Sequence, residues 1–395
     1  MSEREVVILS GVRTAIGDYG GSLKDIAPTD LAARVVREAV TRAKVDPKDV
    51  GQCVFGNVLH TEAKDMYLSR VACVNGGLPV ETGALTLNRL CGSGLQAIVS
   101  ASQYVLLGDI DAAVAGGAES MSRAAYANLT QRWGTRMGDA KSVDMMVGAL
   151  TDPFDTIHMG VTAENVASKC SITREQQDAF AVESHKRAAA AIAAGLFKSQ
   201  ILPIELKSKK GPIQFDTDEH VRVDATIDGM AKLKAAFIKE NGSVTAGNAS
   251  GLNDAAAAVV LMERSVAAKK GLKPLARLVA YGHAGVDPKI MGLGPVSAVK
   301  SALAKCGLTL AQMDVIESNE AFAAQALGVN KELGMNAAKV NPNGGAIALG
   351  HPIGATGCIL MVKAIYELQR SGGRYGLITM CIGGGQGIAA IVERI

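Results

Sequence analysis

Short apolar runs alternate with amphipathic stretches at the start of the chain. Residues 6–9 are aliphatic and β-branched, which is typical of a buried strand. Residues 31–43 carry apolar side chains at helical spacing, and residues 53–55 form a second strand-like run. The order strand, helix, strand indicates an α/β architecture with layered sheets and helices.

The same order returns in the second part of the chain. Residues 276–317 contain two strand-like runs on either side of a helical stretch, and a shift of 263 positions superimposes residues 39–45 on residues 302–308. In each part a glycine-rich turn then precedes a helix of small residues, with Cys91 in the first and His351 in the second. We therefore expect two similar α/β halves.

The residues from about 121 to 249 fit neither half. They include a helix with a clear start signal, Thr173 as N-cap and Gln176 three residues later, and a stop at Gly195. A polar, lysine-rich loop follows at residues 207–212. Because long excursions from a scaffold usually serve binding, we interpret this region as a lid or ligand-binding insertion. The expected domains are an N-terminal half at 1–120 plus 250–271, the insertion at 121–249, and a C-terminal half at 272–395.

Composition narrows the class of protein. The chain has 395 residues, of which 48% are hydrophobic, so it can bury more than one core. Its 44 glycines and few aromatic residues favour close packing of helices against sheets. The formal charge of +3 is spread along the chain without a basic arm, so no nucleic-acid partner is indicated.

The sequence pattern carries no recognisable targeting signal. Residues 1–5 lead into a strand-like run and have neither the apolar core of a signal peptide nor an arginine-rich helix. No apolar stretch is expected to reach membrane-spanning length, so no membrane partner is expected. Seven cysteines without an export signal favour reduced thiols, and we expect the protein to be cytoplasmic.

Cys91 is the most informative residue of the chain. It lies in Leu90-Cys91-Gly92-Ser93-Gly94, just before a long apolar helical stretch. A cysteine is by default a buried structural residue, and that interpretation is kept for Cys53, Cys73, Cys170, Cys306 and Cys358. The small neighbours leave the Cys91 thiol uncovered, and the unpaired N–H groups of a helix start favour thiolate over thiol. Cys91 is therefore a candidate nucleophile.

Two clusters near the C-terminus supply further acid–base groups. His351 lies in Gly350-His351-Pro352, and Pro352 at the first helical position would hold the imidazole in place. Cys381 follows a strand and precedes Gly383-Gly384-Gly385, whose N–H groups can converge on an anion. The ordinary alternatives are a structural histidine and a buried thiol beside a tight turn.

Asn319 stands at the end of a strand in the second half. Its ordinary interpretation is a strand-to-helix cap, for which Asn is a favoured residue. However, Asn319 and the clusters of Cys91, His351 and Cys381 lie at matching ends of matching elements. The pattern therefore predicts one shared site rather than separate coincidences.

Four sequence blocks together resemble the signature blocks of the thiolase family. They are Asn88-Arg89-Leu90-Cys91-Gly92-Ser93-Gly94, Asn319-Glu320-Ala321-Phe322-Ala323, Gly350-His351-Pro352-Ile353-Gly354-Ala355-Thr356-Gly357 and Cys381-Ile382-Gly383-Gly384-Gly385-Gln386-Gly387. The likeness runs essentially end to end, and it is closest to bacterial acetyl-CoA C-acetyltransferases, particularly the broad-range β-ketothiolases that supply polyhydroxyalkanoate synthesis. It implies a thiolase-like α/β fold, in which two similar βαβαβαββ halves form a layered core with an inserted loop domain.

The resemblance also implies a role for each reacting group. Cys91 would be the acylated nucleophile, and His351 would accept its proton. Cys381 would exchange the α-proton of acetyl-CoA. Asn319 would hold a water that, with His351, stabilises the thioester enolate. The N–H groups of Cys91 and Gly383 would form the other oxyanion hole.

Further residues would contact coenzyme A. The resemblance places His158 and Met159 near the acyl and pantetheine end, Ser250 against pantetheine, and Arg222 near the nucleotide. It implies coenzyme A thioesters as substrates, with no metal and no redox cofactor. It also implies a homotetramer built as a dimer of dimers.

The expected function is that of an acyltransferase, an acetyl-CoA C-acetyltransferase or β-ketothiolase. It would interconvert acetyl-CoA plus an acyl-CoA with a 3-ketoacyl-CoA plus coenzyme A by a ping-pong mechanism, with acetoacetyl-CoA and 3-ketovaleryl-CoA as products. The enzymatic alternative is a degradative 3-ketoacyl-CoA thiolase of fatty-acid oxidation. An alternative of another class is a non-catalytic metal-binding or thiol-sensing protein, against which the lack of CxxC and HxxxH spacing counts. A ketoacyl synthase would require two histidines in place of His351 with Cys381.

The chain departs from the family pattern at two places. Ser318 stands before Asn319, where a small or apolar residue is expected, and could alter the packing under the Asn. Lys234-Ala235-Ala236-Phe237 replaces the usual Arg-Pro ahead of the phenylalanine and could loosen a loop near the cofactor. Neither departure removes a reacting group.

Overall fold

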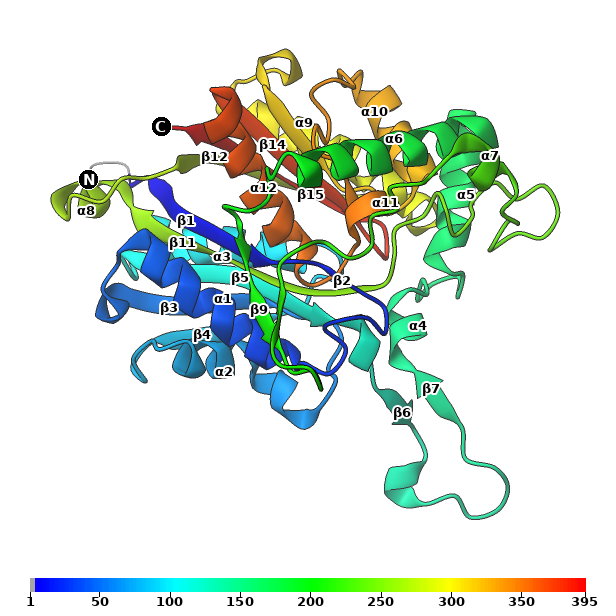
Figure 1. The fold of residues 1–395 in the computed structure, drawn as a ribbon, viewed down its shortest axis with the longest axis horizontal. Helices are drawn as coiled ribbons and strands as arrows, with labels where there is room; N and C mark the ends of the chain where they lie inside the picture. Colours follow the sequence, from blue (N-terminus) through cyan, green and yellow to red (C-terminus); the bar gives the residue numbers. More distant parts are fainter. Residues whose placement is uncertain (1–3) are drawn as a thin grey trace.

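The computed structural model describes residues 4–395 and has a large sheet at its centre (Figure 1). Its main strands are hydrogen-bonded in the order β13-β14-β15-β12-β1-β11-β5-β3-β4. These strands are β1 (Val6–Thr14), β3 (Val50–Gly56), β4 (Gly83–Leu87), β5 (Ala112–Ser120), β11 (Asn253–Glu263), β12 (Ala276–Gly285), β13 (Val315–Ser318), β14 (Tyr375–Ile382) and β15 (Gln386–Arg394). Every residue of β1, β5 and β11 is buried, as expected for strands covered by helices on both faces.

The two halves repeat one topology, which confirms the expected α/β fold. In the N-terminal half β3 is parallel to β5, and β11 is antiparallel to both β5 and β1. In the C-terminal half β13 is parallel to β14, and β15 is antiparallel to both β14 and β12. A short antiparallel pairing of β1 with β12 then joins the halves into one 11-stranded sheet. The sequence did not predict this continuity.

Helices lie on both faces of each half. Helices α1 and α2 pack on the outer face of the N-terminal half, and α9 packs on β12, β14 and β15 (Figure 1). Helices α3 and α12 contact each other between the two halves. The bounds are α1 (Pro28–Ala43), α2 (Leu68–Asn75), α3 (Ser93–Leu107), α8 (Arg264–Lys269), α9 (Gly294–Cys306), α10 (Ala323–Leu333), α11 (Ala346–Leu349) and α12 (Thr356–Ser371). This order of layers matches the expected layered core, with the buried helices α3 and α12 between the halves.

The contact between α3 and α12 depends on two glycines at equivalent positions of the repeat. A Cβ atom on Gly94 would lie 2.8 Å from the Cys358 nitrogen, and one on Gly357 would lie 2.3 Å from the Leu95 nitrogen. Both separations are too short for a real side chain, so the helix starts can approach this closely only without one. The two helix starts that carry the site are therefore held directly against each other.

Most of the predicted elements occur where the pattern placed them. Helices α1 and α9 both end in a left-handed residue, Lys44 and Gly307, at the 263-residue spacing of the repeat. The predicted capping box is present, with Thr173 and Gln176 bonded to each other's backbone at the start of α6 (Arg174–Ala193). One prediction was wrong: Pro352 is not the first residue of a helix, because α12 begins only at Thr356 and Pro352 lies in the turn before it.

One helical segment of the described residues, Leu90–Leu107, is long and apolar enough to cross a membrane by length and composition. The expectation that no apolar stretch reaches this length was therefore wrong. The segment contains α3, which packs against β3, β5 and α12. Its position in the core accounts for its apolar composition.

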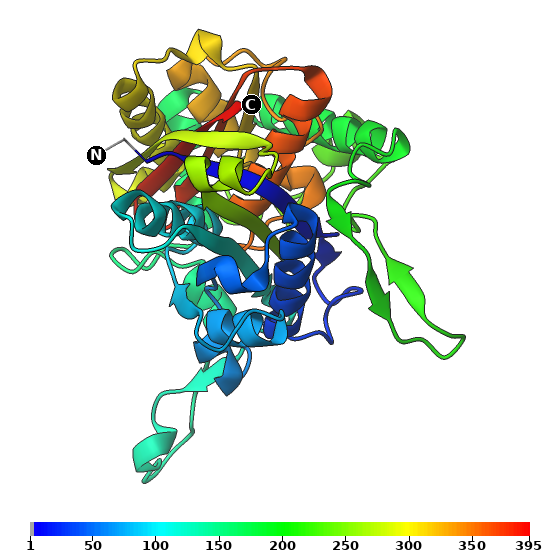
Figure 2. The ribbon, with the colours of Figure 1, turned by 90° about the vertical axis from the view of Figure 1, so that its left-hand side faces the viewer.

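Residues 121–249 leave the two halves and return to them. The hairpin β6–β7 projects from the body of the molecule (Figure 2), whereas α5 packs against α10, and α6 packs against α10 and α11. The elements are β6 (Tyr126–Asn128), β7 (Ser142–Asp144), α4 (Met145–Ala149), α5 (Met159–Cys170), α6 (Arg174–Ala193), β8 (Ile201–Leu202), β9 (Ile204–Leu206), β10 (Ile213–Phe215) and α7 (Ile227–Ala231); the remaining short strand, β2 (Gly17–Asp18), pairs with β11. The domain boundaries drawn from the sequence stay a prediction.

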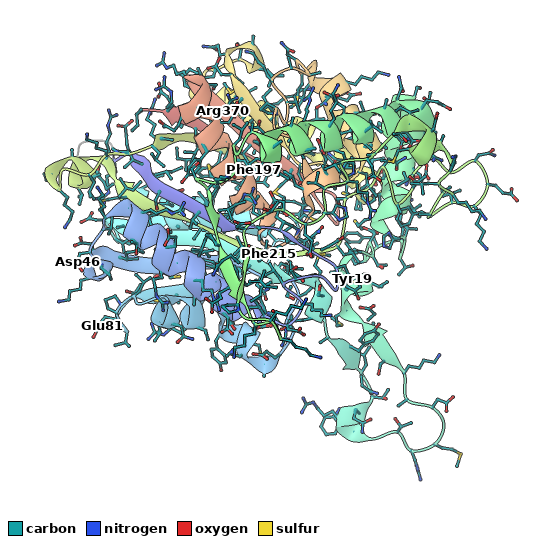
Figure 3. All side chains as sticks on the ribbon, in the orientation of Figure 1. Tyr19, Asp46, Glu81, Phe197, Phe215 and Arg370 are labelled. Carbon is teal, nitrogen blue, oxygen red and sulfur yellow. The ribbon has the colours of Figure 1, made fainter. Side chains whose placement is uncertain are left out.

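A buried ion pair fastens this region to β1. The Arg13 guanidinium donates to both carboxylate oxygens of Asp218, at 2.7 and 2.9 Å, and to Gln200. It also lies over the ring of Phe197, 5.0 Å from the centroid. In Figure 3 Phe197 is labelled near the centre of the view, whereas Asp46 and Glu81 lie toward its edge. A fully buried charge needs such complete pairing. The ion pair therefore anchors the Asp218 segment of this region on β1.

Candidate active site

A cleft of about 470 Å³ gathers most of the residues singled out in the sequence. It brings together Cys91, His351 and Cys381 with His158, Met159, Ser250 and Arg222. Asn319 and Gly383 do not line the cleft but contact residues that do. Asn319 contacts the His351 ring, and the Gly383 N–H approaches the Cys91 sulfur. Residues from distant parts of the sequence therefore form one site, as the matching positions predicted.

A strained turn presents Cys91 two residues before α3. Leu90 has a φ of +45°, a left-handed conformation that side chains other than glycine rarely adopt. Side chains on either side hold this turn: Asn88 Oδ1 accepts the Leu90 N–H at 2.8 Å, and the Ser93 hydroxyl accepts the Arg89 N–H and donates to the Leu90 carbonyl. The conformation is therefore built in by local hydrogen bonds.

The Cys91 thiol is less acidic than the sequence suggested. Burial raises its pKa to about 11, although the N–H groups of Gly383 and of Cys91 itself act in the opposite direction. The residue is half-buried at the bottom of the cleft, where protein surrounds the sulfur even though the cleft reaches it. The N–H groups favour the thiolate, as the sequence predicted, but desolvation by the surrounding protein outweighs them.

Hydrogen bonds at the ring and the main chain hold His351. Its Nδ1 lies 2.8 Å from Thr356 Oγ1, and its backbone N–H donates to Asn253 Oδ1 at 2.9 Å. Only 5% of the residue is exposed, and burial lowers the pKa of the imidazole to about 4. A neutral imidazole that is ready to accept a proton is therefore the resting form.

Cys381 lies within β14 rather than after it. It is the second-to-last residue of this strand, just before the glycines. Its side chain is 1% exposed, and burial together with the neighbouring Cys91 raises its pKa well above the ordinary value. Gly384 and Gly385 follow with φ values of +79° and +83°, which a residue with a side chain would resist. This turn aims the Gly383 N–H at Cys91 while Cys381 faces the same cleft.

Asn319 directly follows β13 and is almost fully buried against His351. Its Nδ2 lies 3.4 Å from Nε2 and 3.5 Å from Nδ1 of the imidazole. Among residues 4–395, its Oδ1 has no hydrogen-bond partner. The strand end below it is held by Asn341, which bonds both backbone groups of Ser318. The Ser318 hydroxyl is buried without a partner in this part of the chain, and the packing under Asn319 is otherwise intact.

The outer wall of the cleft comes from the region between residues 121 and 249. His158 caps α5 by accepting the Gly160 N–H at 3.0 Å and stacks on Phe237, with ring centroids 4.7 Å apart. Desolvation lowers the pKa of His158. Phe237, which directly follows the altered residues 234–236, also contacts the Phe322 ring edge to face, with centroids 6.2 Å apart. Arg222 is exposed at the entrance and Ser250 lies deeper in the cleft.

Three residues of the site were given no role from the sequence. Glu119 is a fully buried carboxyl that accepts the N–H groups of Leu59 at 3.0 Å and Gly354 at 2.8 Å, and burial raises its pKa to about 8. It therefore ties the His351 turn to the N-terminal half. A charged residue inside an apolar strand is a signal that could have identified it. Asn253 and Thr356 gave no comparable signal, because short polar residues at element ends are common.

Residues 4–395 contain no group of three or more His, Cys, Asp or Glu side chains arranged to hold a metal ion. All seven cysteines are free thiols. Nothing in the geometry of these described residues supports the metal-binding alternative.

Comparison with known proteins agrees with this geometry. Residues 6–265 match the family described as the thiolase N-terminal domain, and residues 272–394 match the thiolase C-terminal domain. The chain is 68% identical to the β-ketothiolase BktB of Cupriavidus necator over 99% of this chain and 100% of that one.

Solved structures give the same result. The acetyl-CoA acetyltransferase of Bacillus anthracis superimposes with a TM-score of 0.97 at 45% identity, covering 100% of this chain and 99% of the other. Human mitochondrial 3-ketoacyl-CoA thiolase in complex with CoA gives 0.96 at 44% identity, covering 99% and 98%. The chain belongs to the thiolase family of acyltransferases.

Proposed function

We propose that this chain is a β-ketothiolase with acetyl-CoA C-acetyltransferase activity. It interconverts acetyl-CoA plus an acyl-CoA with a 3-ketoacyl-CoA plus coenzyme A. The observation that carries the proposal is the presence of two thiols and one imidazole in a single cleft, with N–H groups directed at one of the thiols. One thiol can form the acyl-enzyme while the other exchanges a carbon-bound proton.

In the first half-reaction the Cys91 sulfur attacks the thioester carbonyl and its proton passes to His351. The C–S bond of the substrate breaks, and coenzyme A leaves with that proton. The N–H groups of Cys91 and Gly383 support the developing oxyanion, where each such donor is typically worth about 2.7–4 kcal/mol of barrier. Because the resting pair is thiol and imidazole, the proton moves as the sulfur attacks.

In the second half-reaction Cys381 acts as a base only after its thiol has lost its own proton, and the thiolate then removes a proton from the methyl group of acetyl-CoA. The enolate carbon attacks the acyl carbonyl on Cys91, the acyl–sulfur bond breaks, and the released Cys91 sulfur takes the proton that Cys381 removed. Asn319 supports this step, because its buried Oδ1 has a free acceptor site among the described residues and its amide lies against His351. A water held there would donate to the Asn and to the enolate oxygen, and His351 would add a donor from Nε2 when its imidazole is protonated.

The wall around Cys91 favours acyl groups longer than acetyl. In thiolysis the acyl chain of variable length is bound to Cys91, whereas Cys381 exchanges a proton only with the acetyl unit. The residues around Cys91 therefore determine which chain lengths are accepted. That side is an apolar cluster in which Cys91 packs with Met121, Met146 and Ile353. A flexible thioether wall adapts to chains of different length, which suits 3-ketovaleryl-CoA as well as acetoacetyl-CoA.

The alternative is a degradative 3-ketoacyl-CoA thiolase, favoured by the likeness to the human mitochondrial enzyme. The much higher identity to a bacterial β-ketothiolase supports the first proposal. The ratio of kcat/KM on acetoacetyl-CoA, 3-ketovaleryl-CoA and a long 3-ketoacyl-CoA separates them. A preference for the long substrate would assign the degradative function.

The nucleophile itself is tested by trapping the acyl-enzyme. The protein is incubated with acetyl-CoA and quenched in acid, and the acetyl group is mapped by mass spectrometry. We expect the adduct on Cys91, with the other six cysteines unmodified. An adduct elsewhere, with Cys91 free, would contradict the assignment.

Coenzyme A contacts are assigned to Arg222 and Ser250, with His158 and Met159 nearer the acyl end. All four line the cleft, and Arg222 supplies a positive charge at its entrance, where the phosphates of the ligand would lie. Arg222→Ala should raise the KM for coenzyme A far more than it lowers kcat, because the contact is remote from the reacting atoms. An unchanged KM would count against this contact.

The active form is assigned as a cytoplasmic homotetramer built as a dimer of dimers. The β6–β7 hairpin projects from the body and exposes Leu129, Trp133 and Met137, which suits contact with another copy. Light scattering that returned a stable monomer at micromolar concentration would refute it. Seven free thiols suit a reducing compartment, and recovery of the native protein in a membrane or periplasmic fraction would contradict the location.

A further inference from the structure

The Thr356 hydroxyl makes two short contacts beside His351. Thr356 is the first residue of α12 and is 3% exposed. Its Oγ1 lies 2.8 Å from His351 Nδ1 and 2.9 Å from the Pro352 carbonyl oxygen. Both distances require a hydrogen between the two atoms, because two lone pairs at this separation repel each other.

Only one arrangement of protons satisfies both contacts. A hydroxyl has one hydrogen to donate, whereas the carbonyl of Pro352 can only accept. If Thr356 donated to His351 Nδ1, its contact with the carbonyl would contain no hydrogen. If Thr356 donates to the carbonyl, its oxygen accepts from an Nδ1–H of the imidazole and both contacts are filled. The second arrangement places the single proton of neutral His351 on Nδ1.

We propose that Thr356 is a positioning residue that fixes His351 as the Nδ1–H tautomer, so that Nε2 carries the lone pair that accepts the Cys91 proton. This inference rests on the proposed role of His351 as the base. In the opposite tautomer Nε2 would carry a hydrogen, and the ring would have no free acceptor except the nitrogen that faces Thr356. Acylation of Cys91 would then need a tautomer change first.

Thr356 supplies the hydroxyl that sets the tautomer of His351, because no carboxylate is bonded to the ring among the described residues. Among residues 4–395, neither ring nitrogen of His351 has a carboxylate partner; besides the contact with Thr356, the hydrogen-bonding contacts of the ring are with the Asn319 amide nitrogen, at 3.4 and 3.5 Å. Asn253 holds the backbone N–H of His351 and not the ring. Serine hydrolases use a carboxylate to set the histidine tautomer. Here a neutral hydroxyl would do so without adding a charge beside the two thiols.

The tautomer can be observed directly in the free protein. Protein labelled with ¹⁵N at histidine contains six imidazoles, and the His351 signals are assigned as those lost in His351→Asn. We expect Nδ1 of His351 to carry the hydrogen in the parent and in Thr356→Ser. In Thr356→Val, which has the same shape without a hydroxyl, we expect a mixture or the Nε2–H form. An Nε2–H tautomer in the parent would overturn the inference.

Kinetics distinguish positioning from general damage. Thr356→Val should slow acetylation of Cys91 by acetyl-CoA about 10- to 100-fold, the range for loss of one buried hydrogen bond, with KM nearly unchanged. Thr356→Ser should recover most of the rate. Equal rates in the parent and Thr356→Val, or failure of the serine variant to recover, would overturn it. If His351→Asn still acetylates Cys91 at the parent rate, the proposed base is wrong, and the tautomer measurement shows separately whether Thr356 orients the ring.

Discussion

The starts of α3 and α12 occupy equivalent places in the two halves, yet they position their reacting groups in different ways. At α3 the backbone positions the group: Cys91 follows a left-handed residue, and main-chain N–H groups point at its sulfur. At α12 side chains do it: Thr356 holds the His351 ring and Asn253 holds its backbone N–H.

The difference matches what each group must do. A nucleophilic sulfur becomes an anion and its substrate an oxyanion, so fixed N–H dipoles serve both. An imidazole must present one chosen nitrogen, which requires a partner for the other nitrogen. The repeat also shifts: the position equivalent to Cys91 is Gly354, and His351 lies three residues before it. One scaffold thus supports two kinds of preorganisation.

The largest expected effect separates the two thiols. Cys91→Ser should lose condensation, thiolysis and acetyl exchange between acetyl-CoA and labelled coenzyme A, by on the order of 10⁴-fold or more. Cys381→Ser should keep appreciable exchange while condensation and thiolysis fall about 10²- to 10⁴-fold, because a hydroxyl is too weak an acid to exchange a carbon-bound proton near neutral pH.

Deuterium washout at the acetyl-CoA methyl group gives the matching control. It should disappear in Cys381→Ser. Washout at the parent rate in that variant would assign the α-proton to another base, with His351 the first candidate.

The second prediction concerns pH and sharpens the contrast between the backbone-held thiol and the side-chain-held imidazole. Because the pKa of Cys91 is raised to about 11, its alkylation by iodoacetamide should rise about tenfold per pH unit from pH 7 to pH 10 without a plateau. Because the pKa of His351 is lowered to about 4, no inflection is expected near pH 6.5. Mass spectrometry of the Cys91 peptide measures the rate. A plateau above pH 7 would instead indicate a preformed thiolate–imidazolium pair.

The smallest effect tests the shared scaffold. Gly94→Ala and Gly357→Ala should each lower the free energy of unfolding by about 1–3 kcal/mol, because the added Cβ overpacks the contact between α3 and α12. Gly357→Ala should cost more, since its Cβ would lie closer to backbone. Denaturant unfolding measures both. Gly148→Ala in α4, where a Cβ meets no atom within 4 Å, is the control and should be neutral or slightly stabilising. A neutral Gly357→Ala would show that the two helix starts do not need this close approach.

The sequence determined much of this protein because many signals are local. The capping box of α6 and the apolar periodicity of α1 depend on neighbours in the chain, and both appear in the structure. The 263-residue repeat is visible in the sequence because the same local pattern occurs twice, and it also appears in the structure. The glycine-framed blocks around Cys91, His351 and Cys381 also identified the residues that the cleft brings together. Local sequence was enough to single out residues that share one cleft.

Only the tertiary structure decided how those groups behave. A helix start suggested an acidic Cys91 thiol, but its pKa depends on how much protein surrounds the sulfur, and that protein comes from distant segments. Pro352 was expected to begin a helix, but the chain makes a turn first, and this turn brings Thr356 Oγ1 to the His351 ring. Burial and hydrogen-bond partners are set by residues far apart in sequence, so they cannot be inferred from a motif alone.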